Sequence, residues 1–368
     1  MQRALATVNP DAVTRNSARL IRELGGRSSL CAVVKADGYG HGAVVAAQAA
    51  LDGGASWLAV AAASEAGELR ESLPHVPILT MGALTADETD IALGARSDVA
   101  VWRPEFLRLV AERAAALGLV ARVHVKYDSG MGRLGHRDPE SVRALVAEAA
   151  ADDRAELVGL WTHFATADEP GSEFFDEQLA RFRELALPVK QEHPSLLLHA
   201  ANSAATLRDP DSHFDMVRCG IAIYGLDPFH EDPAKRDLEP ALELRSYVAD
   251  VKRFEQGAGA GYGQSWRAPR DTCVGVLPIG YGDGVRRGLS NNAEVLVGGH
   301  RYPLVGTVSM DNITIDLGPD TDVEPGAPAV LIGSQGEERI LAEEVARRLD
   351  TINYEVTCGI SARVPRRT

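Results

Sequence analysis

Reactive side chains follow apolar runs at five places in the first 230 residues of this chain. Lys35 ends the run "LCAVV" and is followed at once by "ADGYGHG", a glycine-rich stretch that carries Tyr39. Later runs are followed by basic, imidazole, amide or hydroxyl groups at Arg133, His163, Asn202, Ser203 and Arg218. A lysine amine can form an imine, an arginine can pair with carboxylate or phosphate, and a histidine can move protons. Such groups serve one reaction only if the fold brings them together.

The elements that must position these groups alternate between β-rich runs and helical stretches. Eight runs are strand-like: "CAVVKA", "WLAVAA", "PILTM", "DVAVW", "ARVHVK", "LVGLWTHF", "SLLLHAA" and "MVRCGIAIYG". Helical stretches such as 105–117 and 173–185 lie between them. This alternation predicts an α/β fold, a (β/α)8 TIM-type barrel over residues 1–230. Active sites of such barrels lie at the carboxyl ends of the strands, where all of these side chains are expected.

The pattern changes after Asp227 to strand-like runs joined by glycine-rich turns. The runs are "LELRSYVADVKRF", "TCVGVLPIGYG", "AEVLVGGHRYPLVG", "NITIDL" and "PAVLIGS", with a hairpin expected at Gly298-Gly299 and one helix near 341–349. They predict a C-terminal, mostly β domain over residues 231–368. The run "GAGAGYG" fits neither a dinucleotide loop nor a P-loop. We expect its glycines to free the backbone around Tyr262.

Composition narrows the class of protein. The 368 residues are 45% hydrophobic and 24% charged, as in a soluble protein of about two domains. A net charge of −14 argues against nucleic acid as a partner. No window is apolar enough to cross a membrane and the start lacks a secretory segment, so we expect a cytoplasmic enzyme. The four cysteines lack the spacing of a metal site, so no metal is expected.

The loops after the seventh and eighth strands commonly bind phosphate in this barrel. Ser203 offers a hydroxyl there, and Gly220 and Ile221 offer backbone N–H groups. A phosphate site, a strand-end lysine at Lys35 and an arginine at Arg218 in one pocket suggest pyridoxal phosphate as the cofactor.

The stretch "AVVKADGYGHG" resembles the pyridoxal-lysine motif of alanine racemases. The resemblance continues through "KYDSGMGRLG", "WTHFATAD", "HAANSAA", "DMVRCGIAIYG", "AGYGQSW", "IGYGDG", "SMDN" and "INYEVTC", nearly end to end. It implies a fold type III, pyridoxal-phosphate-dependent isomerase that interconverts L-alanine and D-alanine by a two-base mechanism on an aldimine and supplies D-alanine for peptidoglycan. It also implies a head-to-tail homodimer in which each site is completed by the partner's β domain.

By matching position, the resemblance implies a role for each of several residues. Lys35 would hold the cofactor and act as the base on the D side, and Tyr262 from the partner chain would act on the L side. Racemisation needs two bases, because one removes the α-proton and the other returns a proton to the opposite face. Arg218 would face the pyridine nitrogen and, being hard to deprotonate, would make the ring a weaker electron sink. His163 would lie between Arg218 and Tyr262.

The resemblance assigns the remaining site residues to cofactor, substrate and entrance. The phosphate contacts would be Tyr39, Ser203, Gly220, Ile221 and Tyr354. The substrate carboxylate would meet Arg133 and the backbone N–H of Met310, and the entrance would be narrowed by Tyr281 and Tyr354. Lys126 matches a position that family members carbamylate to orient Arg133; the alternative is an ordinary lysine in an ion pair.

The sequence is also compatible with three other functions. A broader-specificity racemase that also accepts serine differs only in tolerating one hydroxyl. Fold type III amino-acid decarboxylases share the barrel and the lysine but are not expected to carry "AGYGQSW" and "SMDN" together. A non-catalytic pyridoxal-phosphate carrier would lack the β domain. Ser129 and Ser309 stand where family members often have Thr and Cys, and both are small polar exchanges.

Overall fold

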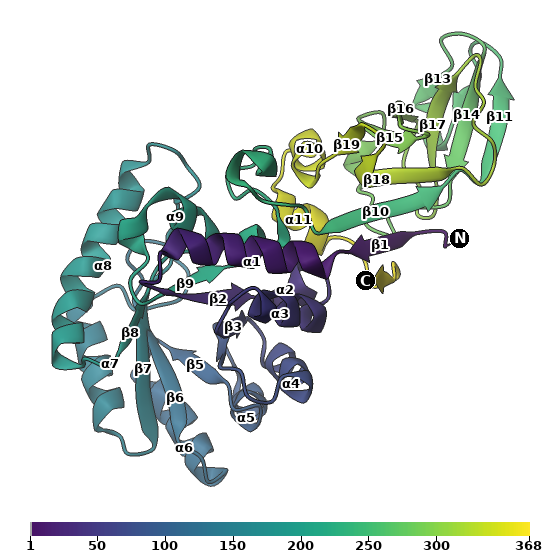
Figure 1. Ribbon diagram of the computed structural model, residues 1–368. Helices are drawn as coiled ribbons and strands as arrows, with labels where there is room; N and C mark the ends of the chain where they lie inside the picture. The colour runs from purple at the N-terminus through teal and green to yellow at the C-terminus, as the bar shows by residue number, and fades with distance from the viewer. Residues whose placement is uncertain (1) are drawn as a thin grey trace. The chain divides into compact units, whose positions relative to one another are not determined.

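The eight β-rich runs of the first part of the chain form eight parallel strands in the computed structural model, which describes residues 2–368 (Figure 1). They are β2 (Ser29–Val33), β3 (Trp57–Val60), β4 (Ile78–Thr80), β5 (Asp98–Val101), β6 (Ala121–Lys126), β7 (Ala155–Trp161), β8 (Leu197–His199) and β9 (Met216–Cys219). Strand β2 pairs with both β3 and β9, so the sheet curls back on itself into a nearly closed barrel. The predicted (β/α)8 architecture is confirmed.

Helices connect these strands and cover the barrel. They are α1 (Pro10–Leu24), α2 (Lys35–Tyr39), α3 (Ala43–Asp52), α4 (Ala63–Ser72), α5 (Ala86–Gly94), α6 (Pro104–Ala116), α7 (Pro139–Ala151), α8 (Glu173–Glu192) and α9 (Ser203–Arg208). Helix α8 runs seven residues beyond the predicted end at Leu185 and passes through Pro188. A proline removes one backbone hydrogen bond from a helix. Its buried neighbours Ala186 and Val189 continue the packed face of the helix.

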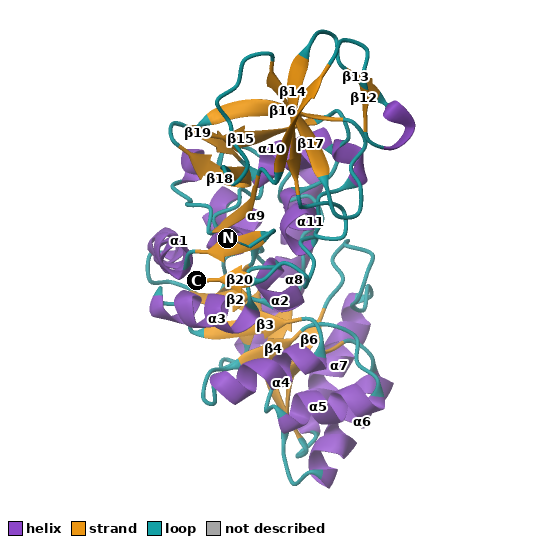
Figure 2. Cartoon of the chain, turned by 90° about the vertical axis from the view of Figure 1, so that its right-hand side faces the viewer, coloured by secondary structure: helices purple, strands orange, loops and turns teal. Residues whose placement is uncertain are grey.

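The chain divides into two units, Val13–Ile223 and the residues before Val13 together with Tyr224–Thr368. The second unit holds a large sheet in the order β11-β14-β17-β16-β15-β18-β10-β1-β20, with β19 paired to β18, and a separate β12-β13 pair. Strands dominate this unit (Figure 2). Their bounds are β1 (Leu5–Val8), β10 (Leu242–Tyr247), β11 (Asp250–Phe254), β12 (Gly259–Ala260), β13 (Trp266–Arg267), β14 (Thr272–Leu277), β15 (Ala293–Val297), β16 (His300–Val305), β17 (Ile313–Gly318), β18 (Pro328–Gln335), β19 (Glu338–Ile340) and β20 (Arg366–Arg367).

Local chemistry explains two features of the second unit. Strands β15 and β16 form the predicted hairpin, with Val297 opposite His300. Its turn residues Gly298 and Gly299 have φ angles of 59° and 81°, which a two-residue type I′ turn requires. The predicted helix appears as α10 (Ala342–Arg348) and is followed by α11 (Asn353–Cys358). Within residues 2–368, no helix is long and apolar enough to cross a membrane.

Candidate active site

Lys35 opens a backbone turn of left-handed conformation directly after strand β2. The next four residues, Ala36, Asp37, Gly38 and Tyr39, have φ angles of 53°, 51°, 59° and 55°. For residues other than glycine, this conformation costs about 1–2 kcal/mol each, because Cβ crowds the following carbonyl oxygen. Three of the four residues therefore carry backbone strain. Strain of this kind persists only where surrounding contacts enforce it, and it concentrates at functional sites.

Two carboxylates enforce the turn. Glu65, on helix α4, accepts a hydrogen bond from the backbone N–H of Ala36 at 2.6 Å through Oε1. Its Oε2 accepts from two backbone N–H groups at the start of α4, both at 2.9 Å. Asp37 accepts from the N–H of Ala43, the first residue of α3, at 2.9 Å. The turn that carries Lys35 is thus tied to two of the barrel's helices.

Arg218, on strand β9, is almost fully buried and is held by four acceptors. Its guanidinium donates to the carbonyl oxygens of Thr162 at 2.8 Å and Ala200 at 3.0 Å. It also donates to Nδ1 of His199 at 3.0 Å and to Nδ1 of His163 at 3.2 Å. Burial lowers the pKa of Arg218 to about 10, so the guanidinium still carries its charge at neutral pH. Arg218 thus contacts His163, whereas the predicted position of His163 beside Tyr262 stays a prediction.

A chain of hydrogen bonds leads from Arg218 into the barrel interior. Because a guanidinium only donates, Nδ1 of His199 must accept, and its Nε2 carries the proton. That Nε2–H donates to Nδ1 of His124 at 2.9 Å, and Nε2 of His124 donates to Asp98 at 3.1 Å. Burial, with Arg218 as the next cause, holds the pKa of His199 well below its usual range. The hydrogen bonds therefore define the tautomer of His199 and the accepting nitrogen of His124, and the chain ends at a carboxylate.

Four cations approach His163 at the mouth of the barrel. Burial lowers the pKa of His163 well below its usual value, and the nearby charges of Arg218, Arg133, Lys126 and Lys35 lower it further. Lys126 ends strand β6 with only 2% of its surface exposed, and its ammonium lies 4.2 Å from the centre of the Trp161 ring. Burial, then the charge of Arg133, lowers the pKa of Lys126 to about 7. The structure thus brings these five predicted residues close enough for their charges to interact.

A cluster of hydroxyl and backbone N–H groups lies after strands β8 and β9. The Ser203 hydroxyl accepts from the backbone N–H groups of Gly220 at 3.1 Å and Ala222 at 3.3 Å. A Cβ added to Gly220 would lie 2.4 Å from the Tyr39 hydroxyl, so only glycine fits there. Two hydroxyls and a backbone N–H therefore converge, as binding of a phosphate requires. Ile221 is the next residue, whereas Asn202 accepts from the N–H of Ala205 as the N-cap of α9.

The loop that presents Arg133 is shaped by residues of the same predicted motif. Asp128 accepts from the backbone N–H groups of Gly130 at 3.1 Å and Gly132 at 3.0 Å. The Ser129 hydroxyl lies 2.8 Å from that of Thr162, which follows strand β7. Ser129 therefore supplies a hydroxyl that links this loop to the end of strand β7.

The other predicted residues belong to the second unit. Tyr262 begins the short 3₁₀ turn Tyr262–Gln264, between Gly261 and Gly263, which both have positive φ as the glycine-rich run predicted. Its side chain is 73% exposed, and Tyr281 and Met310 are also exposed. Tyr354 lies in α11, with its ring 6.4 Å from that of His230. The placement of these residues against a barrel site remains a proposal.

Sequence reasoning missed four residues that support the barrel site: Glu65, Asp98, His124 and His199. The signal for the histidines was present, because "ARVHVK" and "SLLLHAA" place an imidazole inside apolar strands. A buried polar side chain needs a partner, which predicts a network within the barrel. Asp98 stands at the start of its strand and Glu65 in a helix, and neither pattern distinguishes them from surface carboxylates.

Comparison with known proteins decides the family. The profile of the alanine racemase N-terminal domain matches residues 8–228, and that of the alanine racemase C-terminal domain matches residues 241–368. The chain belongs to the alanine racemase family. The alanine racemase of Symbiobacterium thermophilum is 42% identical over 368 residues, covering 100% of this chain and 97% of that protein. The alanine racemase of Geobacillus stearothermophilus is 42% identical over 370 residues, covering 98% of this chain and 92% of that protein.

Solved structures of the family agree. The alanine racemase of Streptomyces coelicolor superposes with a TM-score of 0.92 at 40% identity, covering 99% of this chain and 97% of that chain. The alanine racemase of D-cycloserine-producing Streptomyces lavendulae gives 0.94 at 37% identity, covering 100% and 97%. The family resemblance inferred from the motifs is confirmed over both domains.

Proposed function

We propose that this chain interconverts L-alanine and D-alanine with pyridoxal phosphate held at Lys35, in a homodimer with shared active sites. The observation that carries the proposal is the convergence of Lys35, Lys126, Arg133 and Arg218 on the neutral His163. Such an excess of positive charge suits an anionic cofactor and a substrate carboxylate. The second predicted base, Tyr262, comes from the domain that the family's C-terminal profile matches.

The residues present fit pyridoxal phosphate. The hydroxyls of Ser203 and Tyr39 with the backbone N–H of Gly220 would hold its phosphate, and Arg218 would donate to its ring nitrogen. When bound at Lys35, pyridoxal phosphate would withdraw electrons from the substrate's α-carbon and make its proton acidic. Because burial leaves Arg218 protonated, the guanidinium would contribute a hydrogen bond rather than a proton.

Two groups of the protein would move the α-proton. Nζ of Lys35 would act on one face of the substrate, and Oη of Tyr262 from the partner would act on the other. Nδ1 of His163 accepts from Arg218, so in the neutral ring Nε2 carries the proton. That N–H is suited to donate to a tyrosinate oxygen and to stabilise its charge. Arg133 and the backbone N–H of Met310 would bind the substrate carboxylate.

The direct test is to incubate the purified protein with L-alanine and follow loss of optical activity, with and without added pyridoxal phosphate. L-serine serves as the second substrate, because the breadth of specificity is part of the question. Lys35→Ala is expected to abolish nearly all activity, since it removes both the cofactor anchor and one base. Release of carbon dioxide in place of racemisation would contradict the proposal in favour of a decarboxylase.

Exposed apolar side chains on the second unit support the proposed homodimer. Tyr262 is 73% and Met310 51% exposed, so both side chains are accessible to a partner. We assign this surface to the barrel mouth of a second copy. Mixing Lys35→Ala with Tyr262→Phe subunits should restore about a quarter of wild-type activity, because half of the dimers are mixed and each has one intact site. If subunits exchange and no activity returns, both residues act within one chain.

We further propose a cytoplasmic location and a role in supplying D-alanine for peptidoglycan, as is general for the family. The cysteines support the location, because the described part of the chain contains no disulfide among them. Growth of a D-alanine auxotroph on expression of this chain would test the role.

A further inference from the structure

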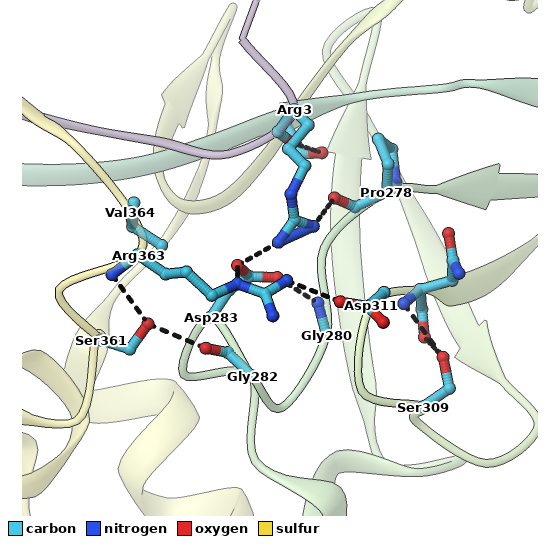
Figure 3. A network of polar contacts seen from close by, with 12 residues as sticks. Arg3, Pro278, Gly280, Gly282, Asp283, Ser309, Asp311, Ser361, Arg363 and Val364 are labelled. Atoms are coloured by element: carbon cyan, nitrogen blue, oxygen red, sulfur yellow. Dashed lines mark hydrogen bonds and ion pairs between the residues drawn. The ribbon is translucent and has the colours of Figure 1, made fainter.

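The buried carboxylate of Asp283 holds together two loops of the second unit (Figure 3). Its side chain is fully buried, with an exposure of 0%. Oδ2 accepts from the backbone N–H of Gly280 at 2.9 Å, within the loop that carries Tyr281. Oδ1 accepts from the guanidinium of Arg3 and from Nε of Arg363, the latter at 3.0 Å. A buried charge with three donors is well compensated and resists displacement.

The loop of Asp283 is joined by its backbone to the loop that carries Met310. The N–H of Tyr281 donates to the carbonyl oxygen of Ser309 at 2.9 Å, and the N–H of Gly282 donates to that of Met310 at 2.9 Å. The two backbones approach so closely that a side chain at Gly280 would not fit. A Cβ on Gly280 would lie 2.3 Å from the carbonyl oxygen of Ser309. The positions of Tyr281 and Met310 are therefore coupled.

The two arginines tie this pair of loops to both ends of the chain. Arg363, five residues from the C-terminus, donates to Asp311 at 2.6 Å as well as to Asp283. Arg3, near the N-terminus, also donates to the carbonyl oxygen of Pro278 at 2.7 Å. Two arginines thus face two aspartates, and the charges balance. Figure 3 shows Asp283 between the two guanidinium groups.

We propose that Asp283 is a positioning residue for substrate recognition, which fixes the separation between the Tyr281 ring and the backbone N–H of Met310. This inference rests on the proposed function, which assigns the entrance to Tyr281 and the substrate carboxylate to Met310. The carboxylate itself touches no substrate. By setting that separation it limits the size of the amino-acid side chain that fits, and so favours alanine over larger amino acids.

The test compares Asp283→Asn with a matched control, Asp232→Asn, in the holoenzyme. Asp232 lies in the same unit, accepts from the N–H of Ala234 at 3.0 Å and pairs with Arg339, so its substitution removes the same kind of contacts but none to either loop. Kinetics are measured with L-alanine and L-2-aminobutyrate, which is longer by one methylene. Hydrogen exchange by mass spectrometry is followed over 278–285 and 307–313.

An asparagine presents one oxygen where Asp283 uses two. We expect Asp283→Asn to raise KM for alanine about tenfold with kcat changed less than about threefold, because the loss concerns binding rather than the chemical step. Its preference for alanine over 2-aminobutyrate should fall about fivefold, since one methylene contributes modestly to discrimination. Exchange should rise in both segments, and the control should show none of these changes. Faster exchange with unchanged KM and preference would reduce Asp283 to a structural role and overturn the proposal.

Arginine variants keep the inference testable if Asp283→Asn fails to fold. Arg363→Gln should raise KM for alanine more than Arg3→Gln, because Arg363 contacts both Asp283 and Asp311. An equal or reversed order would contradict the coupling of the loops. The proposed function is judged separately by the wild type: a wild-type protein that leaves L-alanine unchanged defeats that function, whereas an active wild type with an unaltered Asp283→Asn defeats only this inference.

Discussion

Glu65→Gln is expected to loosen the left-handed turn that carries Lys35. Glu65 accepts three backbone N–H groups, one from Ala36 through Oε1 and two from the start of α4 through Oε2. A glutamine has a single acceptor oxygen, so in either orientation its NH₂ group faces a backbone donor. The variant therefore loses the hydrogen bonds of either Oε1 or Oε2, and it loses the negative charge that both oxygens share.

The size of the effect follows from the strain in the turn. Ala36, Asp37 and Tyr39 adopt positive φ, which amounts to about 3–6 kcal/mol at about 1–2 kcal/mol each. A hydrogen bond to a charged group stabilises by about 1.5–3 kcal/mol, so its loss is comparable with that strain. A loss of about 2 kcal/mol in local stability corresponds to about thirtyfold faster opening.

Hydrogen exchange over residues 34–42 measures this opening directly, and it does not require the whole chain to unfold in one step. Glu68→Gln is the matched control, because Glu68 is exposed on the same helix α4. Exchange over 34–42 should accelerate about thirtyfold in Glu65→Gln and stay nearly constant in the control. Added pyridoxal phosphate should bind more weakly to Glu65→Gln only. Equal exchange in the two variants would refute the assignment of Glu65 as the support of the turn.

Three further predictions concern single side chains. Burial holds the pKa of Lys126 at about 7, against 10.5 for an ordinary lysine. Between these two pH values the unfolded chain binds one proton more than the folded chain, so the free energy of unfolding should rise with pH across that window. Lys126→Met should flatten this rise, as measured by urea unfolding in carbonate-free buffer. With ¹³CO₂ present, the wild type should give a carbamate carbon signal that Lys126→Met lacks. A wild type without that signal would show that Lys126 is an unmodified amine. His199→Phe keeps a flat ring over Trp161 but removes the acceptor for Arg218, and should lower kcat/KM for alanine at least about tenfold; an unchanged rate would contradict its role. Tyr262→Phe should slow α-proton exchange of L-alanine in deuterated water far more than that of D-alanine, whereas equal losses would refute the assignment of faces.

The fold could be predicted where the sequence pattern was local. Each of the eight predicted runs overlaps one barrel strand, and Gly298-Gly299 forms the expected hairpin turn. The first strand, Leu5–Val8, could not be placed in this way. It pairs with β10, more than two hundred residues later, and no local pattern specifies such a partner. The extension of α8 through Pro188 was likewise hidden, because burial beyond the proline outweighs its local preference.

The candidate site was predictable at the residues that end strands. Lys35, His163 and Arg218 follow or end apolar runs, and barrel topology brings the ends of such runs to one mouth. Side chains that support these residues from helices or from inside strands had no comparable signal. The left-handed turn after Lys35 was only hinted at by Gly38 and Gly40, because Ala36 and Asp37 also adopt positive φ and neither residue type predicts it.

Charge balance links the lowered pKa values to the proposed ligands. The charges of Lys35, Lys126, Arg133 and Arg218 all lower the pKa of His163, and the carboxylate of Asp128 raises the pKa of Lys126. Burial and repulsion from Arg133, Arg218 and Lys35 favour release of a proton from Lys126. Carbon dioxide adds to a neutral amine and releases one proton, so the same burial that lowers the pKa of Lys126 prepares it for carbamylation. The resulting carboxylate would pair with Arg133. The cofactor phosphate and the substrate carboxylate would pair with other cations, so each proposed anion is matched by a positive charge already present in the barrel.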